Sequence, residues 1–304
     1  MNFERIRPTI DVDRMQQAHV TVVGGAYGLT QDLVRCGVGA VTYVDFDRVD
    51  ATNPARQDFG MADVGRHKAD ALAEALARIN PDVEVNCLTR DFCEFGRDEF
   101  DAHFGHTDLL ILATDFFPAQ ARGNREAMRL GKPALSIGLY RGGRAGEIIY
   151  HVPGVTPACY RCVASARYRA FEAQARAAAA PAGPADAGGV NVPSTGGTVL
   201  DLHLVDAIAG QVAVGILTAG ADNRMGRLIA QLGNRNLLQV KIDPEYRMGE
   251  RDIFGRHLGD GPANFSFTTI ALPQEPEADC LDCALARATV AAHCHSHGGV
   301  AVMP

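Results

Sequence analysis

The chain has 304 residues, of which 47% are hydrophobic and 21% are charged, a composition typical of a globular protein with one large domain or two smaller ones. Its net charge of −7 argues against nucleic acid as the main partner, because non-specific nucleic-acid binding needs clustered positive charge. The N-terminus lacks the apolar run of a secretory signal, and the longest apolar helical stretch, 207–219, is too short to span a bilayer. We therefore expect a cytoplasmic protein with no membrane partner.

The first half of the chain alternates apolar runs with helical patterns. Short runs rich in β-branched and aliphatic residues predict strands at 20–23, 41–44, 83–88, 109–113 and 134–139. Apolar residues at helical spacing, followed by stop signals, predict helices at 29–36 and 68–79. This alternation predicts an α/β fold of the Rossmann-like, doubly wound type, with a mostly parallel sheet covered on both faces.

The second half is less regular. Between 170 and 197 the composition shifts to alanine, proline and glycine, which predicts a loop that can begin with a short alanine-rich helical segment. A helix is expected from about 199 to 219, and short C-terminal strands and turns between 228 and 270.

A glycine-containing turn follows the first predicted strand. Gly25 and Gly28 lie in it, where the N-terminus of the next helix can bind phosphate through free N–H groups. Asp45 ends the second strand, the position from which an acidic residue accepts hydrogen bonds from a ribose. The glycine pattern is interrupted by Tyr27 and Thr30, so this turn alone is also compatible with simple packing of a strand on a helix.

Two Cys-x-x-Cys pairs lie far apart, Cys159 with Cys162 and Cys280 with Cys283. Two such pairs supply the four thiolates of a closed, tetrahedral zinc site. We therefore expect one structural Zn²⁺ bound by these four cysteines.

The residues after the second strand form a specific string. Its parts are Asp45-Phe46-Asp47, Asn53-Pro54-Ala55-Arg56-Gln57, Asp63-Val64-Gly65-Arg66-His67-Lys68, Asn80-Pro81 and Thr114-Asp115. Together with the cysteine pairs, this string resembles the ThiF/MoeB/HesA superfamily, which includes the adenylation domains of ubiquitin-activating enzymes. The resemblance covers residues 19–165 well and is weakest over 170–270.

The resemblance implies a single adenylation domain over residues 1–304. Residues 1–158 would form its nucleotide-binding half, and 159–304 would hold the zinc site, a crossover loop at about 170–197 and the C-terminal half. It also implies ATP, Mg²⁺ and Zn²⁺ as cofactors.

The resemblance further implies the residues of an ATP site. Asp45 would bind the ribose, Asn53, Arg56 and Lys68 the phosphates, and Asp115 the magnesium ion. Gly25, Gly28, Asp47 and Gln57 would complete the nucleotide site. The catalytic set would be Arg56, Lys68 and Asp115, and their chemistry fits, because arginine and lysine pair with phosphate oxygens and a carboxylate suits magnesium.

The reaction implied is acyl adenylation, in which a carboxylate attacks the α-phosphate of ATP and pyrophosphate leaves. The carboxylate would belong to the C-terminal glycine of a ubiquitin-like or sulfur-carrier protein, or to a short peptide. The resemblance also implies a homodimer.

One element of the family pattern is missing. Many members carry an acceptor cysteine shortly after the crossover loop, but residues 191–197 contain none. We therefore expect direct transfer to a downstream acceptor, which could be a partner's thiol, a sulfur donor or an amine, with Cys93 and Cys294 as alternative acceptor thiols. Two other readings remain at this point, a partner-binding subunit with the same fold and a nicotinamide-dependent oxidoreductase.

Overall fold

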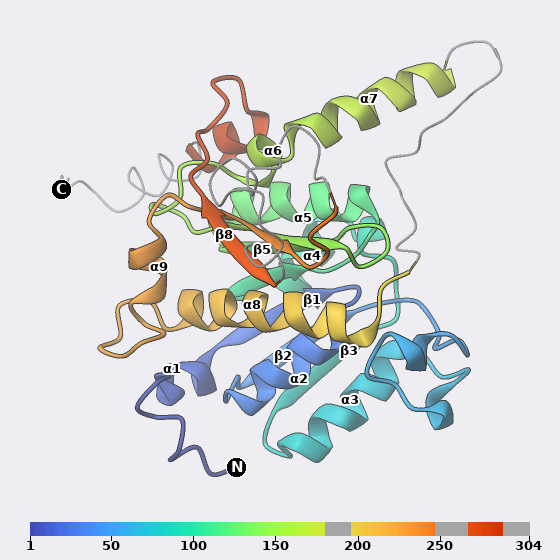
Figure 1. Cartoon of the computed structure of the whole chain (residues 1–304), viewed down its shortest axis with the longest axis vertical. Coiled ribbons are helices and arrows are strands. Elements are labelled where there is room, and N and C mark those ends of the chain that lie inside the picture. The colour runs from blue at the N-terminus through green and yellow to red at the C-terminus, as the bar shows by residue number, and fades with distance from the viewer. Residues whose placement is uncertain (180–195, 247–266, 288–304) are drawn as a thin grey trace.

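The computed structural model describes residues 1–179, 196–246 and 267–287, and its framework is one eight-stranded sheet (Figure 1). Its strands are β1 His19–Val23, β2 Ala40–Val44, β3 Glu84–Leu88, β4 Leu109–Leu112, β5 Ala134–Leu139, β6 Ala145–His151, β7 Leu237–Lys241 and β8 Thr268–Leu272. The α/β class and the mostly parallel sheet expected from the sequence are confirmed.

The order of the strands is β3-β2-β1-β4-β5-β6-β7-β8. The neighbours β3–β2, β2–β1, β1–β4 and β4–β5 pair in parallel. Strands β6, β7 and β8 extend the sheet beyond β5 with antiparallel pairs. Chain order reverses between β1 and β4, so the carboxyl ends of these strands flank a crevice where α/β proteins bind their ligands.

Helices cover both faces of the sheet (Figure 1). They are α1 Val12–Gln17, α2 Tyr27–Arg35, α3 Lys68–Ile79, α4 Arg97–Phe104, α5 Phe117–Leu130, α6 Tyr160–Val163, α7 Ser165–Ala179, α8 Val199–Leu217 and α9 Leu228–Leu232, with short 3₁₀ helices η1 Asn53–Ala55, η2 Met61–Asp63 and η3 Phe92–Glu94. Helices α2, α3 and α8 share one core with the sheet, whereas α4 and α5 pack with aromatic residues on the other face.

The long apolar helix α8 meets the length and composition of a membrane span, with 44% of its most apolar window buried inside the protein. It packs on α2 and on strands β5 and β6, and it carries the buried Asp206. These contacts are those of a core helix that closes one face of the sheet.

The predicted strands and the helices at 68–79 and 199–219 are present, the latter ending at Leu217. The alanine-rich helical start that the sequence allowed for the 170–197 loop is present, because α7 continues to Ala179. Ten of the fifteen residues of α7 are alanine or arginine, which are strong helix formers, and this local preference outweighs the loop signal. The rest of that prediction, up to residue 195, lies outside the described residues, as does Cys294.

Candidate active site

A cavity of about 1030 Å³ opens at the carboxyl ends of the parallel strands. It brings together every residue that the sequence assigned to nucleotide and magnesium binding: Gly25, Gly28, Asp45, Asp47, Asn53, Arg56, Gln57, Lys68 and Asp115. These residues come from three separate strand-to-helix connections of the chain, so their convergence in one cavity is a property of the fold. The part that each plays in binding or catalysis stays a prediction.

The two glycines of the turn each have a packing reason. A Cβ on Gly25 would lie 2.6 Å from the carbonyl oxygen of Ala113, after β4. A Cβ on Gly28, in the first turn of α2, would lie 2.8 Å from Asp58 Oδ2. Gly25 is therefore required by the close approach of the backbone after β4, whereas a Cβ at Gly28 would displace the end of the Asp58 side chain.

Asp45 is held by two tyrosines that the sequence analysis did not assign. The hydroxyls of Tyr27 and Tyr43 lie 3.1 and 3.3 Å from Oδ2, and the Asp47 N–H donates to Oδ1 over 2.8 Å. Burial raises the pKa of the Asp45 carboxyl, and Lys68 opposes this rise. A carboxylate has about four acceptor positions, so Asp45 has room to accept one ribose hydroxyl.

The side chain of Lys68 is anchored at the start of α3. Its Nζ lies 3.0 Å from Asp47 Oδ2, and its backbone N–H donates to the Asp47 carbonyl. The Lys68 side chain is largely buried, whereas Asp47 is half-exposed. The lysine is therefore preorganised at the cavity wall, and a triphosphate would compete with Asp47 for its ammonium group.

Asp115 is exposed at the cavity, directly after β4 and before α5. The preceding Thr114 fixes this turn, because its hydroxyl accepts the Phe116 N–H and its carbonyl accepts Gln120 Nε2 over 2.6 Å. An exposed carboxylate on a fixed turn is a suitable magnesium ligand.

A polar wall on the other side of the cavity was missed by the sequence analysis. Glu147 on β6 is buried, pairs with Arg167 on α7 and accepts the Tyr140 hydroxyl over 2.7 Å. Arg167 also reaches the hydroxyl of Tyr160, between the first two cysteines. No local motif marks these residues, because they meet only when β6 and α7 pack together.

A histidine–aspartate corner was also missed. His203 Nε2 on α8 lies 3.0 and 3.1 Å from the two carboxylate oxygens of Asp58. One turn further along α8, Asp206 is buried and accepts the Leu29 N–H at the start of α2. Burial raises the pKa of Asp206 to about 7. All three acidic or basic side chains line the cavity.

The four cysteines Cys159, Cys162, Cys280 and Cys283 come together, with all four sulfurs within 4.8 Å of one another and all four residues buried. Three sulfur pairs are separated by 3.9, 3.6 and 3.6 Å. Four thiolates around one zinc ion, each about 2.3 Å from it, stand roughly 3.8 Å apart. The cluster therefore fits a closed tetrahedral zinc site, and its geometry leaves no ligand position for a substrate.

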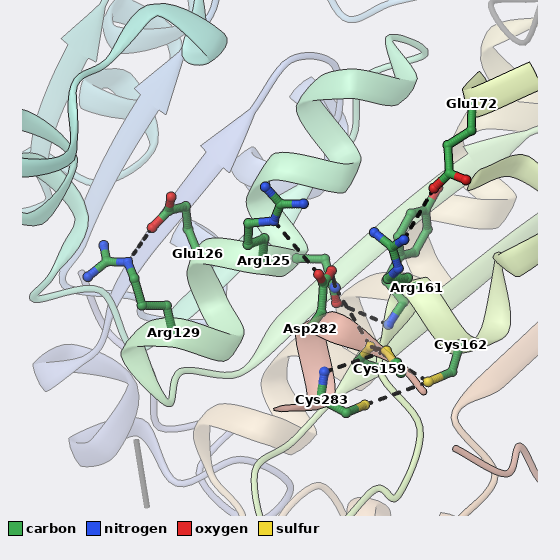
Figure 2. Close-up of polar contacts among 12 residues, drawn as sticks. Arg125, Glu126, Arg129, Cys159, Arg161, Cys162, Glu172, Asp282 and Cys283 are labelled. Atoms are coloured by element: carbon green, nitrogen blue, oxygen red, sulfur yellow. Dashed lines mark hydrogen bonds and ion pairs between the residues drawn. The ribbon is translucent and has the colours of Figure 1, made fainter. Parts of the chain in front are cut away.

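Helix α5 links this cluster to the nucleotide half. Asn124 is fully buried; its Oδ1 accepts the Tyr160 N–H over 3.0 Å and its Nδ2 donates to Asp282 Oδ2 over 2.6 Å. Figure 2 shows Arg125 directed at Asp282 from the same helix, with an Nε–Oδ1 distance of 3.7 Å. Helix α5 thus contacts both cysteine pairs, through residues that lie between the cysteines of each pair.

The acceptor-thiol alternatives gain no support from the described residues. Cys93 does not line the cavity, and burial raises the pKa of its thiol to about 11, which leaves little thiolate at neutral pH. No cysteine is found among the described residues that line the cavity.

Comparison with known proteins identifies the family. The ThiF family model matches residues 1–235, so the chain belongs to the ThiF family. It is 28% identical over 176 residues to ubiquitin-like modifier-activating enzyme 5 of Caenorhabditis elegans, a match that covers 54% of this chain and 41% of the relative. It is 33% identical over 157 residues to sulfur carrier protein adenylyltransferase of Thermus thermophilus, covering 50% of this chain and 57% of the relative. The matches thus span about half of the length of these curated relatives.

Solved structures show the same fold. The E. coli MccB structure with ATP superposes with a TM-score of 0.60 at 16% identity, covering 90% of this chain and 68% of MccB. PaaA superposes with a TM-score of 0.54 at 18% identity, covering 78% of this chain and 73% of PaaA. The curated relatives are named as activating enzymes and adenylyltransferases, in agreement with the class of enzyme expected from the sequence.

Proposed function

We propose that this protein uses ATP to adenylate a C-terminal carboxylate of a ubiquitin-like protein, a sulfur-carrier protein or a short peptide. The observation that carries this proposal is the convergence of the predicted nucleotide residues, from three connections, in one cavity of about 1030 Å³. This volume is at the upper end for small-molecule sites, which leaves space for a nucleotide and the end of an acyl substrate.

In this proposal the cavity residues have different roles, which follow from their positions. Asp45 accepts a ribose hydroxyl, and Arg56 and Lys68 neutralise the charge that develops on the phosphates while the carboxylate attacks. Asp115 holds the magnesium ion, which supplies further charge neutralisation at the phosphates. The rate gain comes from positioning and electrostatic stabilisation, because proton transfer is not needed for this step.

The four-cysteine cluster holds Zn²⁺ as a structural ion. The buried, closed set of four sulfurs supports this assignment, since a catalytic zinc keeps one position open for water or substrate. We further propose a cytoplasmic homodimer with a single adenylation domain per chain and no downstream acceptor residue of its own.

The names of the relatives suggest the choice of substrates to test. Relatives are named for ubiquitin-like modifier activation and for sulfur-carrier adenylation, and MccB has been solved with its MccA partner. A test panel therefore includes a ubiquitin-like protein, a sulfur-carrier protein and a short synthetic peptide.

The decisive measurement is exchange of labelled pyrophosphate into ATP with each member of this panel. We expect one class to support exchange in the wild-type protein. Arg56→Ala, Lys68→Ala and Asp115→Ala should each lower the exchange rate by roughly 10²–10³, the usual cost of losing a preorganised charge-stabilising group. Arg78→Ala, at the other end of α3, is the matched control and should exchange normally.

A second candidate is a partner-binding subunit without adenylation activity. Tyr27 and Thr30, which interrupt the glycine pattern of the phosphate-binding turn, favour it, because backbone approaches a phosphate most closely at glycine. A wild-type protein that binds a panel member but exchanges no pyrophosphate with any of them would favour this candidate over the enzyme.

A further inference from the structure

The corner formed by His203, Asp58 and Asp206 is not used in the adenylation step. His203 comes from the second turn of α8, and Asp58 follows the Arg56-Gln57 segment, so two distant parts of the chain build the pair. The pair lies over the first turn of α2, where the Cβ that Gly28 lacks would touch Asp58 at 2.8 Å and His203 at 3.3 Å. A larger residue at position 28 would therefore displace the Asp58 side chain.

The orientation of the pair is that of a general base. Both contacts to Asp58 involve His203 Nε2, so in the neutral ring Nε2 carries the proton and Nδ1 keeps its lone pair. A carboxylate that holds one imidazole nitrogen also stabilises the cation formed when the other nitrogen takes a proton. His203 is 47% exposed in its side chain, which leaves the ring accessible to a ligand in the cavity.

The acidic side chains around this corner favour a cationic ligand over an anionic one. Asp58 and Asp206 both line the cavity, and Asp206 already occupies the Leu29 N–H at the start of α2. The Asp58 carboxylate repels a phosphate and attracts an ammonium group, and Asp206 adds to this effect when it is ionised. The corner is therefore better suited to a cation than to the triphosphate.

We propose that His203, Asp58 and Asp206 form a subsite for a primary amine, which accepts the acyl group from the acyl-adenylate. This inference rests on the proposed adenylation and names the class of its downstream acceptor. The described residues of the cavity include no cysteine that could accept the acyl group first, which agrees with an external acceptor.

The amine reacts directly with the acyl-adenylate, and His203 accepts the proton that the ammonium group must lose. The ammonium group gives one proton to His203 Nδ1, and the resulting amine attacks the carbonyl carbon of the acyl-adenylate. A C–N bond forms, the C–O bond to the phosphate breaks, and AMP leaves with the electron pair of that bond. The second proton leaves the nitrogen to water as the adduct collapses, so the products are an amide, AMP and protons. His203 is the general base of this step.

The first experiment tests the subsite without an acyl substrate. Ethylammonium chloride is titrated into the full chain, and the His203 ring signals, assigned with His203→Gln, are followed by NMR. We expect a saturable shift with ethylammonium and none with sodium acetate, and Asp58→Asn should weaken ethylammonium binding about tenfold or more. An absent ethylammonium response, or a response to acetate instead, contradicts the proposal.

The second experiment measures transfer from acyl-adenylate formed by the protein, with the carboxylate substrate that supports pyrophosphate exchange. Ethylamine is protonated at neutral pH and must lose a proton to a base before it can attack. Hydroxylamine is largely unprotonated at neutral pH and therefore depends less on a base. His203→Gln should lower transfer to ethylamine by about 10²-fold or more and transfer to hydroxylamine by much less. His106→Gln, an exposed histidine outside the cavity, is the control.

The outcomes separate the two proposals. If wild-type protein exchanges no pyrophosphate with any substrate, adenylation is contradicted, and the ethylammonium titration still decides the subsite. If exchange proceeds but His203→Gln lowers both transfers equally, or neither, the role of His203 as the base is wrong.

Discussion

At the scale of single residues, the cavity holds acidic groups in unlike environments. Asp115 is exposed, Asp45 is buried under two tyrosine hydroxyls, and Asp206 is buried with one backbone N–H donor. Desolvation disfavours the charged form of a carboxyl group. Burial therefore raises the pKa of the Asp206 carboxyl to about 7. Such a raised pKa has a measurable consequence for stability.

Asp206→Asn should stabilise the protein at pH 8. The folded-state pKa of about 7 lies above the ordinary value of 3.8, so between these values the native protein binds more protons than the unfolded chain. Stability is therefore lost as the pH rises through this window, by up to about 4 kcal/mol, and asparagine removes that loss. Melting curves should show an advantage of the variant that is absent near pH 4, grows up to about pH 7 and then stays level. An advantage independent of pH would contradict the assignment.

At the scale of elements, α5 connects the two halves of the site. It begins directly after Asp115, and Gln120 and Asn124 lie one turn apart on it, so both face the cysteine cluster. Gln120 joins the Thr114 carbonyl to the Tyr160 hydroxyl, and Asn124 joins the two cysteine pairs. The turn that presents Asp115 is thus fixed to the same helix that contacts both cysteine pairs.

Asn124→Leu should weaken metal binding while it preserves side-chain volume. It leaves the Tyr160 N–H and the Asp282 carboxylate without their partner, and unsatisfied buried groups cost about 1–3 kcal/mol each. Loss of such a supporting contact typically weakens metal affinity about 10–100-fold, which zinc competition with a chelator measures. Arg125→Ala removes only the 3.7 Å contact of a half-exposed arginine to Asp282 and should have a smaller effect. Equal effects of the two variants would mean that Asn124 does not support the cluster as described.

At the scale of the whole molecule, the cysteine cluster joins distant parts of the chain. Cys159 and Cys162 lie at α6, beside the nucleotide half, whereas Cys280 and Cys283 follow β8 at the end of the sheet. The segment after β8 also contacts α5 through Asp282 and α7 through Glu277, and the metal would add ligand bonds that hold it to the first cysteine pair. The energy of metal binding then contributes directly to folding.

Cys162→Ser and Cys280→Ser should therefore each lose the zinc and lower the melting temperature. A loss of about 4 kcal/mol corresponds to a drop of roughly 10 °C for a chain of this size. Metal analysis of the purified wild type should find about one zinc per chain, and Cys93→Ser, outside the cluster, should retain it. A metal-free wild type that melts at the same temperature as the two variants would rule out the structural zinc.

The sequence by itself determined the fold class and the family, and it singled out residues that line one cavity. It could do so because periodic apolar runs specify strands and helices locally, and because the string from Asp45 to Lys68 and the cysteine pairs are short motifs with fixed spacing. It also allowed an alanine-rich helical segment at the start of the 170–197 loop, and residues 170–179 form the C-terminal part of α7.

Only the tertiary structure decided how distant residues combine. Tyr27 and Tyr43 hold Asp45, Arg167 pairs with Glu147, and the His203–Asp58 pair closes the cavity over Gly28. Each of these contacts joins side chains from separate elements, and each is fixed by the packing of α2, α7 and α8 against the sheet. A sequence pattern records neighbours along the chain, whereas the chemistry of a corner such as His203–Asp58 depends on a distance that exists only after folding.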